Sequence, residues 1–319
     1  MQQKPPAPTP SASQSNIGQL RMGGAEWALL FLHAMLWGSS YFFIAVAKNE
    51  LPVFTITSLR MVPAVLVIVT IIWIAGYRLP STWREWGPFI PLSLLNNYLP
   101  FCLIVYAQHQ VTGGIAAVFC ATTPLFGMFM AHVLTRDEKL SANKLAGVVI
   151  GIGGVAILAL PDLMAGTADA LWAKLALLGA ALLYASGGIY ARGFSRYPPM
   201  VLSGAHMSMT LVLSLPAMLI IDRPWTLPMP SWPVIASVAG TGIFASALAS
   251  IIFFTLIKRA GATNALLVTL LLPVTPMVLG YLLLGERMSG RELAGAAVIG
   301  LALLVIDGRL VRRLLGEKH

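Results

Sequence analysis

The sequence is short of charged residues. Only 10% of its 319 residues are Asp, Glu, Lys or Arg, whereas 57% are hydrophobic. A soluble globular protein carries about 25% charged residues, so this chain has too little polar surface to be soluble in water. Most side chains must contact lipid, where only helices and closed barrels satisfy the backbone. The apolar runs are about 20 residues long and do not alternate with polar residues, which predicts transmembrane helices and excludes a barrel.

Cysteine and buried acidic residues are also scarce. Cys102 and Cys120 lack any CxxC or metal-ligand spacing, so we interpret them as small buried residues. All 12 Asp and Glu residues lie in the tails or at the ends of apolar runs. A carboxylate pair, a metal cluster or an activated nucleophile cannot be assembled, so we expect no enzyme activity, no cofactor and no metal. A carboxylate proton relay within the membrane has no candidate either.

The net charge of +9 does not indicate a nucleic-acid-binding protein. Apart from Arg60, which lies inside a span, the 21 Lys and Arg residues stand singly or in pairs at the ends of apolar runs rather than on one face. With the N-terminus placed in the cytoplasm, fifteen of them fall on the cytoplasmic side and five on the other. This bias predicts that both termini are cytoplasmic.

Apolar windows bounded by Pro, Gly and charged residues predict ten membrane spans. They cover residues 26–47, 52–76, 87–108, 113–135, 143–161, 170–191, 198–221, 232–257, 262–284 and 289–307. A Pro- and Ser-rich tail at 1–25 is expected to be disordered in the cytoplasm, and a basic cytoplasmic tail follows at 308–319. Gly-rich runs at 151–158 and 295–304 predict close packing of the fifth and tenth spans.

The two halves of the chain resemble each other. A shift of 148 residues pairs Glu138 with Glu286, and a shift of 147 lays LWGSS (36–40) over LYASG (183–187). The copies, residues 26–161 and 170–307, hold five spans each. Because five is odd, the second copy must enter the membrane from the opposite face. The predicted fold is therefore an all-α integral membrane protein with ten transmembrane helices in two inverted five-helix repeats, an architecture with its solute site between the halves.

Three segments carry a family resemblance. They are LWGSSYFF at 36–43, ELPVFTITSLRM at 50–61 and GERMSGRELAGAAVIGLALLV at 285–305. Together with the repeat and the topology, they resemble the EamA family of the drug/metabolite transporter superfamily over about residues 26–307. The resemblance implies a secondary transporter, usually a bacterial inner-membrane exporter of amino acids or other small metabolites such as organic acids. Substrates vary widely within the family.

Polar and aromatic residues inside the spans are candidates for the wall of a central cavity. His33, Trp37, Ser40 and Tyr41 share one helix face, and Tyr184 takes the place of Trp37 in the second copy. Such groups are costly against lipid, so each faces either a ligand or another helix. The candidate substrate-binding residues are Trp37, Ser40, Tyr41, Arg60, Asn96, Asn97, Tyr98 and Tyr184. Packing between helices remains the alternative for each of them.

Histidine and proline supply candidates for coupling and motion. His206 and His33 are candidates for proton coupling, because an unperturbed imidazole titrates near pH 6.5. A structural role for both histidines, with facilitated diffusion, stays open. Pro124, Pro273 and Pro276 interrupt the equivalent fourth and ninth spans, which predicts hinges, although static kinks are the alternative.

Arg60 is the only basic residue well inside a span. It lies eight residues beyond Pro52, about 12 Å along a helix and so near the middle of the membrane. Three arrangements are open for its side chain. The guanidinium reaches out to water, donates to carbonyls freed by kinked helices, or pairs with an anionic group of the substrate.

These observations predict a secondary transporter that moves a small organic solute by alternating access through a central cavity. The resemblance implies that the solutes are small metabolites and that they move outward. A nucleotide-sugar or phosphate-ester antiporter is the alternative within transport, but it would need more inward basic residues than Arg60. A membrane-embedded enzyme or sensor is the alternative outside transport. The expected partners are a small-molecule substrate and the lipid bilayer of the bacterial inner membrane, without nucleic acid, and both a monomer and a homodimer remain open.

Overall fold

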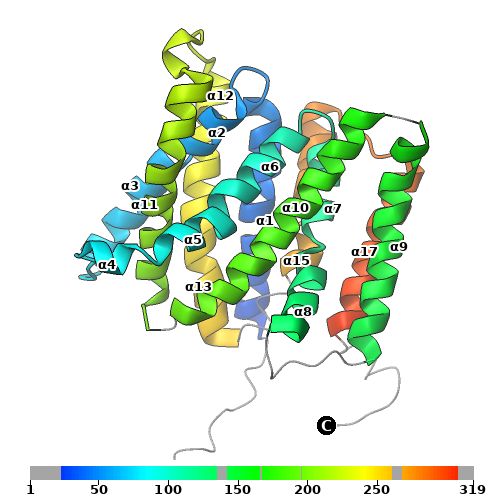
Figure 1. Cartoon of the computed structure of the whole chain (residues 1–319), viewed down its shortest axis with the longest axis horizontal. Helices are drawn as coiled ribbons and strands as arrows, with labels where there is room; N and C mark the ends of the chain where they lie inside the picture. Colours follow the sequence, from blue (N-terminus) through cyan, green and yellow to red (C-terminus); the bar gives the residue numbers. More distant parts are fainter. Residues whose placement is uncertain (1–22, 135–141, 166, 195, 261–267, 308–319) are drawn as a thin grey trace, which may run out of the picture.

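The computed structural model describes residues 23–134, 142–165, 167–194, 196–260 and 268–307. Within these ranges the chain is helical and contains no β-strand (Figure 1). The first helix begins at Gly24, two residues before the predicted span. Apart from residues 23–25, the tails predicted at 1–25 and 308–319 lie outside the described residues.

The helices follow the predicted spans closely. The first half contains α1 (Gly24–Ala47), α2 (Val53–Leu59), α3 (Met61–Ile74), α4 (Trp83–Trp86), α5 (Phe89–Ser93), the π-helix η1 (Leu94–Tyr98), α6 (Leu99–Ala107), α7 (Gly113–Cys120), α8 (Thr123–Leu134) and α9 (Ala142–Ala165). The second half contains α10 (Ala168–Ala191), η2 (Arg192–Phe194), α11 (Pro199–Ala217), η3 (Met218–Asp222), η4 (Pro224–Thr226), α12 (Trp232–Gly240), the π-helix η5 (Thr241–Leu248), α13 (Ala249–Ala260), α15 (Val268–Leu271), α16 (Val274–Leu279), η6 (Gly280–Leu284) and α17 (Gly290–Asp307).

Seven helical stretches of the described chain are long and apolar enough to cross a membrane. They are Gly24–Ala47, Val53–Ile74, Trp83–Ala107, Gly113–Met130, Ala168–Ala191, Pro199–Asp222 and Trp232–Phe253. Two further apolar helices, Leu145–Ala159 and Val274–Leu284, are shorter. The tenth predicted span coincides with α17, which carries charged residues near both of its ends.

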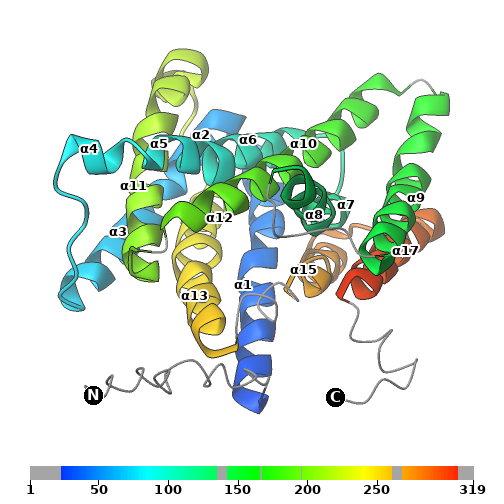
Figure 2. The same cartoon turned by 60° about the horizontal axis from the view of Figure 1, so that its bottom comes forward.

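Helix α1 occupies the centre of the helix assembly. It packs against α12, η5 and α13 on one side and against α7, α15 and α16 on another (Figure 2). Around it, α3 contacts α11 and η5, while α10 contacts α6, α7, α8 and η1. The buried apolar core follows these contacts and includes Ile44, Ile56, Phe119 and Leu177.

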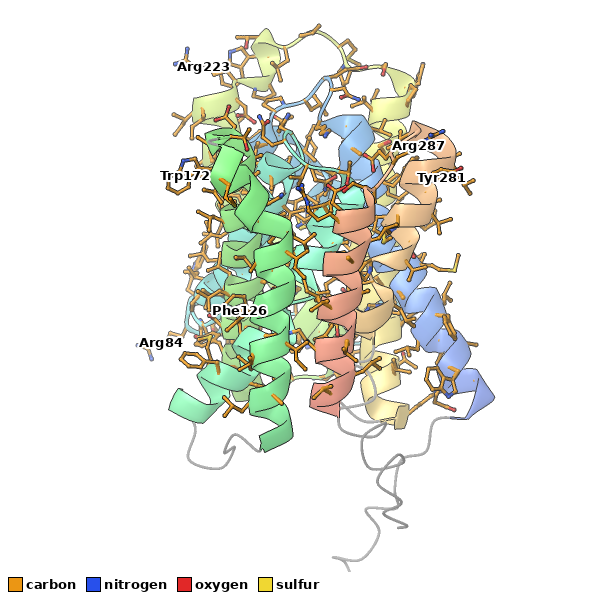
Figure 3. All side chains as sticks on the ribbon, turned by 90° about the vertical axis from the view of Figure 1, so that its right-hand side faces the viewer. Arg84, Phe126, Trp172, Arg223, Tyr281 and Arg287 are labelled. Carbon is orange, nitrogen blue, oxygen red and sulfur yellow. The ribbon has the colours of Figure 1, made fainter. Side chains whose placement is uncertain are left out.

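Helices α9 and α17 form a pair at one edge of the molecule (Figures 1 and 3). Their contact depends on glycines. A Cβ on Gly154 would lie 2.7 Å from Cγ1 of Ile299, and one on Gly295 would lie 2.6 Å from Cγ of Leu158. Side chains at these glycines would push the helices apart. The close packing predicted from the two Gly-rich runs is confirmed.

The fourth and ninth predicted spans are broken as their prolines predict. Helix α7 ends at Cys120 and α8 begins at Thr123, directly before Pro124. The hydroxyls of Thr122 and Thr123 donate to the carbonyls of Phe119 (2.6 Å) and Cys120 (2.7 Å) at this break. In the ninth span α15 ends at Leu271 and Pro273 precedes α16, which contains the buried Pro276. Whether these breaks move as hinges stays a prediction.

Candidate functional site

The buried side chain of Arg60 is the centre of a polar cluster between the two halves of the chain. Arg60 stands at the junction of α2 and α3 and is only 4% exposed. Its Nη1 donates to Oγ of Ser246 in η5 (3.0 Å), and its Nη2 donates to Oδ1 of Asn97 in η1. The guanidinium carbon lies 3.3 Å from the ring centre of Phe101 in α6. Three different elements therefore hold one guanidinium.

Asn97 extends the cluster to α11. Its Nδ2 lies 3.4 Å from Nε2 of His206, whose Nδ1 lies 3.0 Å from the carbonyl oxygen of Ser203. A carbonyl only accepts, so we assign the ring proton to Nδ1, and Nε2 accepts from Asn97. A second proton on Nε2 would face the amide hydrogens of Asn97. In this arrangement the neutral imidazole of His206 has both of its hydrogen bonds.

Two π-helical segments place these residues. A wider turn shifts the side chains that follow it, and such segments often occur at functional sites. In η1 the two adjacent amides point in different directions, as neighbouring residues of a helix do. Asn97 contacts Arg60, whereas Asn96 contacts α10 at Gly187, where an added Cβ would lie 2.8 Å from Cβ of Asn96. In η5 a side chain at Gly242 would collide with the backbone at Arg60, so glycine allows this close approach.

An aromatic group lies beside the polar cluster. The rings of Trp37 and Tyr184 meet edge to face, with their centres 6.5 Å apart. His33 is buried between Trp37 and Phe253, at ring distances of 5.6 and 5.3 Å. Tyr41 is buried and lies near Tyr184, which in turn lies near Arg60. Both halves therefore contribute rings to this aromatic group.

The structure brings together most, but not all, of the predicted site residues. The polar cluster contains Arg60, Asn97 and His206, and the aromatic group contains Trp37, Tyr41, Tyr184 and His33. Asn96 contacts α10 instead, and Tyr98 lies on the side of Cys102 and Asp222. Ser40 is buried on α1. Their substrate-binding roles stay predictions, as do the coupling roles of the two histidines.

The two Nη atoms of Arg60 bind side-chain oxygens of neighbouring helices, contacts that the sequence did not predict. The predicted pairing of Arg60 with an anionic group of the substrate stays a prediction. Ser246 and Phe101 were missing from the predicted site because each lies in an apolar run without a local polar pattern. Only their contact with Arg60 identifies them.

Two acidic residues join the halves at the upper face, the end of the molecule at the top of Figure 1. Glu50 accepts from the backbone N–H and the hydroxyl of Ser231, both at 2.6 Å, at the start of α12. Asp222 accepts from the backbone N–H (2.6 Å) and the hydroxyl (2.9 Å) of Thr55 in the first turn of α2. Each carboxylate thus caps a helix of the opposite half, where unpaired N–H groups favour an anion.

Lys48 and Glu286 form a pair of opposite charges near the same face. The amino group of Lys48 donates to the carbonyl of Gln108. Burial lowers the pKa of Lys48 and raises the pKa of the Glu286 carboxyl, and the attraction between the two groups opposes both changes. The sequence pattern placed both residues simply at span ends. The repeat, which pairs Glu286 with Glu138, was the signal that singled Glu286 out.

The sequence profile described as the EamA-like transporter family matches residues 25–160 and 171–307. The chain belongs to this family. It is therefore a multi-pass membrane transporter of the drug/metabolite transporter superfamily, and the family predicted from the sequence is confirmed.

Relatives with known names agree with this assignment. An uncharacterized inner membrane transporter of Escherichia coli, YedA, is 25% identical over 87% of this chain and 89% of its own length. Protein PecM of Dickeya dadantii is 26% identical over 87% of this chain and 90% of its own. A WAT1-related chloroplastic protein of Arabidopsis thaliana is 25% identical over 88% of this chain and 69% of its own. A solved crystal structure matches with a TM-score of 0.64 at 18% identity, covering 93% of this chain and 100% of the other, which supports the fold alone.

Proposed function

We propose that this EamA-family protein is a secondary transporter that exports small metabolites, such as amino acids or organic acids, from a bacterium by alternating access. The observation that carries the proposal is the buried cluster between the halves. Arg60 and Asn97 come from the first copy, and His206 and Ser246 come from the second. A polar group buried where two copies meet is the expected position of a transporter's solute site. The similarity to YedA, which is described as an inner membrane transporter, supports a location in the inner membrane.

The proposed architecture is ten spans in two inverted repeats, with both termini in the cytoplasm. The two separate matches to the family profile support two copies. The contacts support them too, because they repeat with the halves exchanged: α1 packs on α12 and η5 as α10 packs on α6 and η1, and α3 packs on η5 as α11 packs on η1. The bias of Lys and Arg supports the orientation.

In this proposal the upper face is the outer face, and the structure represents a state closed on that side. Opening outward would separate Glu50 from Ser231 and Asp222 from Thr55, because each contact joins the two halves. The polar cluster would then be reached from outside. In alternating access, the motion that opens the outer face also closes the cytoplasmic side, and the reverse motion closes the outer face again.

Arg60 is the proposed contact for an anionic group of the solute. Its Nε finds no hydrogen-bond partner among the described residues, although the side chain is buried. A guanidinium pairs with a carboxylate through two parallel hydrogen bonds. A carboxylate substrate would therefore use Nε and Nη2, which lie on one edge of the guanidinium, and would replace Asn97.

Flux into proteoliposomes that contain only this protein tests the proposal. We expect uptake or counterflow of at least one carboxylate-bearing metabolite from a broad panel. Arg60→Lys should lower the affinity for carboxylate substrates by about tenfold and leave the affinity for neutral substrates unchanged, because an ammonium group cannot form two parallel hydrogen bonds with a carboxylate. Folded protein without flux for any solute would contradict the transporter assignment. Equal losses for neutral and acidic solutes, with lower thermal stability, would make Arg60 a structural brace.

A further inference from the structure

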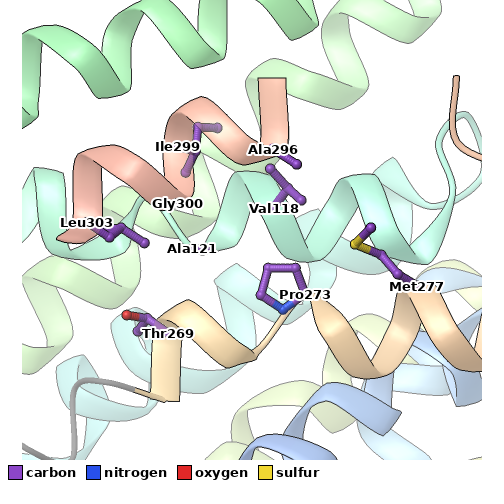
Figure 4. A pocket seen from close by; sticks show the side chains of 9 residues that line it. All are labelled: Val118, Ala121, Thr269, Pro273, Met277, Ala296, Ile299, Gly300 and Leu303. Atoms are coloured by element: carbon purple, nitrogen blue, oxygen red, sulfur yellow. The ribbon is translucent and has the colours of Figure 1, made fainter. Parts of the chain in front are cut away.

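Two cavities lie along the seam where α17 meets α7, α15 and α16. The lower cavity has a volume of about 160 Å³, and its wall includes Val118, Ala121, Pro273, Ile299, Gly300 and Leu303 (Figure 4). The upper cavity has a volume of about 420 Å³ and is lined by Thr112, Tyr281, Glu286, Arg287 and Met288, among others. Met277 lines both cavities, so they adjoin at this side chain. Neither contains a residue of the Arg60 cluster.

The seam is apolar below and charged above. Arg287 and Tyr281 lie near the upper end of the molecule (Figure 3). Glu286 and Arg287 place one negative and one positive group on the wall of the upper cavity. Lys48 is the other charged group near Glu286, and its amino group is held by the carbonyl of Gln108. An occupant of both cavities must therefore have a doubly charged, neutral head and an apolar body.

The length of the seam matches one leaflet of a bilayer. Glu286 and Arg287 form the charged mouth of the upper cavity. Leu284, the last residue of η6 before this mouth, lies eleven positions after Pro273, which lines the lower cavity. At about 1.5 Å per residue this is about 16 Å, against about 15 Å for half of the hydrocarbon core. Large apolar side chains of the same segment, Val278, Leu282 and Leu283, are exposed. The mouth therefore lies at the depth of lipid head groups.

We propose that this seam binds one phospholipid with a zwitterionic, primary-amine head group. Its phosphate meets Arg287, its ammonium meets Glu286, and one acyl chain runs past Met277 into the lower cavity. The two charges of the mouth complement the two charges of such a head group, whereas an anionic head group would place its negative charge beside the Glu286 carboxylate as well as beside Arg287. The lining of the lower cavity is apolar apart from Thr269, which suits a hydrocarbon chain. This inference does not depend on the proposed solute or on the direction of transport.

Two glycines offer a matched pair of variants. Gly300 lines the lower cavity, and a Cβ added there meets nothing within 4 Å, so a leucine can fill the cavity without a collision. Gly153 is also open to an added Cβ but lies on the exposed side of α9, outside both cavities. Gly300→Leu removes the space for the acyl chain, whereas Gly153→Leu makes the same chemical change elsewhere.

Native mass spectrometry of the full-length protein in mild detergent tests whether an acyl chain occupies the lower cavity. Phosphatidylethanolamine and phosphatidylglycerol with identical acyl chains are added in turn. We expect one phosphatidylethanolamine per chain for the wild type and for Gly153→Leu, and a loss of about tenfold in bound lipid for Gly300→Leu. Equal binding by Gly300→Leu and Gly153→Leu would overturn the proposal.

The test of the head-group contacts uses Glu286 and Arg287, which lie between η6 and α17. Arg287→Gln and Glu286→Gln should each weaken the binding of phosphatidylethanolamine by about tenfold, since each substitution removes one charge-assisted contact with the head group. Arg291→Gln, on α17 outside both cavities, is the control and should bind as the wild type does. The proposal is wrong if phosphatidylglycerol binds as well as phosphatidylethanolamine. It is also wrong if a water-soluble zwitterion displaces the lipid.

Discussion

At the scale of the residue, the cost of burying Arg60 shapes the centre of the molecule. An arginine at the middle of a membrane helix costs about 2.5–3.5 kcal/mol on insertion scales. No described hydrogen bond or ion pair joins Arg60 to a carboxylate, so the neutral oxygens of Asn97 and Ser246 and the face of Phe101 offset this cost. The cluster is therefore stable only while all of its partners stay in place.

Asn97→Ala tests this dependence. The substitution removes one acceptor from Arg60 and the donor to His206, and a hydrogen bond to a charged group contributes about 1.5–3 kcal/mol. We expect a clear fall in the unfolding temperature of the detergent-solubilised protein. The control is Asn96→Ala, which changes the same side chain one position earlier, away from Arg60. Similar unfolding temperatures for the two variants would contradict the central role of Asn97.

The sequence singled out Arg60, Asn97 and His206 as polar residues in apolar runs, but not as neighbours. Their contacts join residues 37, 186 and 109 positions apart along the chain. Helical periodicity relates residues within a few turns only. The pattern therefore predicted which residues must avoid lipid, while the packing of α3, η1, α11 and η5 decided what they contact.

At the scale of the element, the breaks in the fourth and ninth predicted spans are the candidate hinges. Breaks at equivalent places of the two copies free carbonyls and weaken the helix where it can bend. Thr122 and Thr123 satisfy the freed carbonyls of the first break through their hydroxyls. Because threonine hydroxyls bind these carbonyls, the helix can bend at the break without leaving the carbonyls unpaired.

Pro273→Ala should slow turnover more than it weakens substrate binding. An alanine restores an N–H and straightens the junction of α15 and α16, without touching the Arg60 cluster. Initial rates and binding affinities measured on the same protein separate the two effects. Pro216, which α11 accommodates without a break, provides the control substitution Pro216→Ala. Equal losses of rate and affinity in Pro273→Ala would count against a hinge.

The cap of α12 gives a pH dependence with a definite sign. The hydroxyl and the backbone N–H of Ser231 hold the pKa of the Glu50 carboxyl below its ordinary value of 4.5. The ionised carboxylate therefore stabilises the closed upper face at pH values above 4.5, and this contribution is lost as the pH falls through the lowered pKa. We expect the titration of Glu50 to leave the stability of the closed state unchanged between pH 7 and 5 and to lower that stability below pH 5. In Glu50→Gln this acid-dependent change in accessibility should disappear. A change confined to the range above pH 5 would show that another group is responsible.

At the scale of the whole molecule, two carboxylate contacts hold the halves together at the upper face. They are short and lie at helix ends, so they can break without disturbing the helices themselves. The pair formed by α9 and α17 stands apart from this region, at the edge of the assembly. In the proposed mechanism, the inner eight proposed spans would be the part that opens and closes.

A native cysteine reports this opening. Cys102 is partly buried, lies near Asp222 and contacts the hydroxyl of Thr57 at 3.7 Å. Asp222→Asn weakens the contact with Thr55, so a water-soluble thiol reagent should label Cys102 severalfold faster than in the wild type. Asp169→Asn, at the exposed start of α10, is the control for the loss of one charge. An unchanged rate would show that this contact does not hold the upper face closed.

The sequence by itself determined the membrane environment, the family and nearly all helix positions. These properties depend on local quantities, namely the length of apolar runs and the positions of Pro, Gly and charged residues, which a single sequence displays directly. Tertiary structure alone decided that Ser246 and Phe101 complete the site of Arg60, that Asn96 turns away from it, and that Glu50 and Asp222 cap helices of the opposite half. These contacts cross between the copies, and their geometry depends on helix packing and on the wider turns of η1 and η5, which no local pattern encodes.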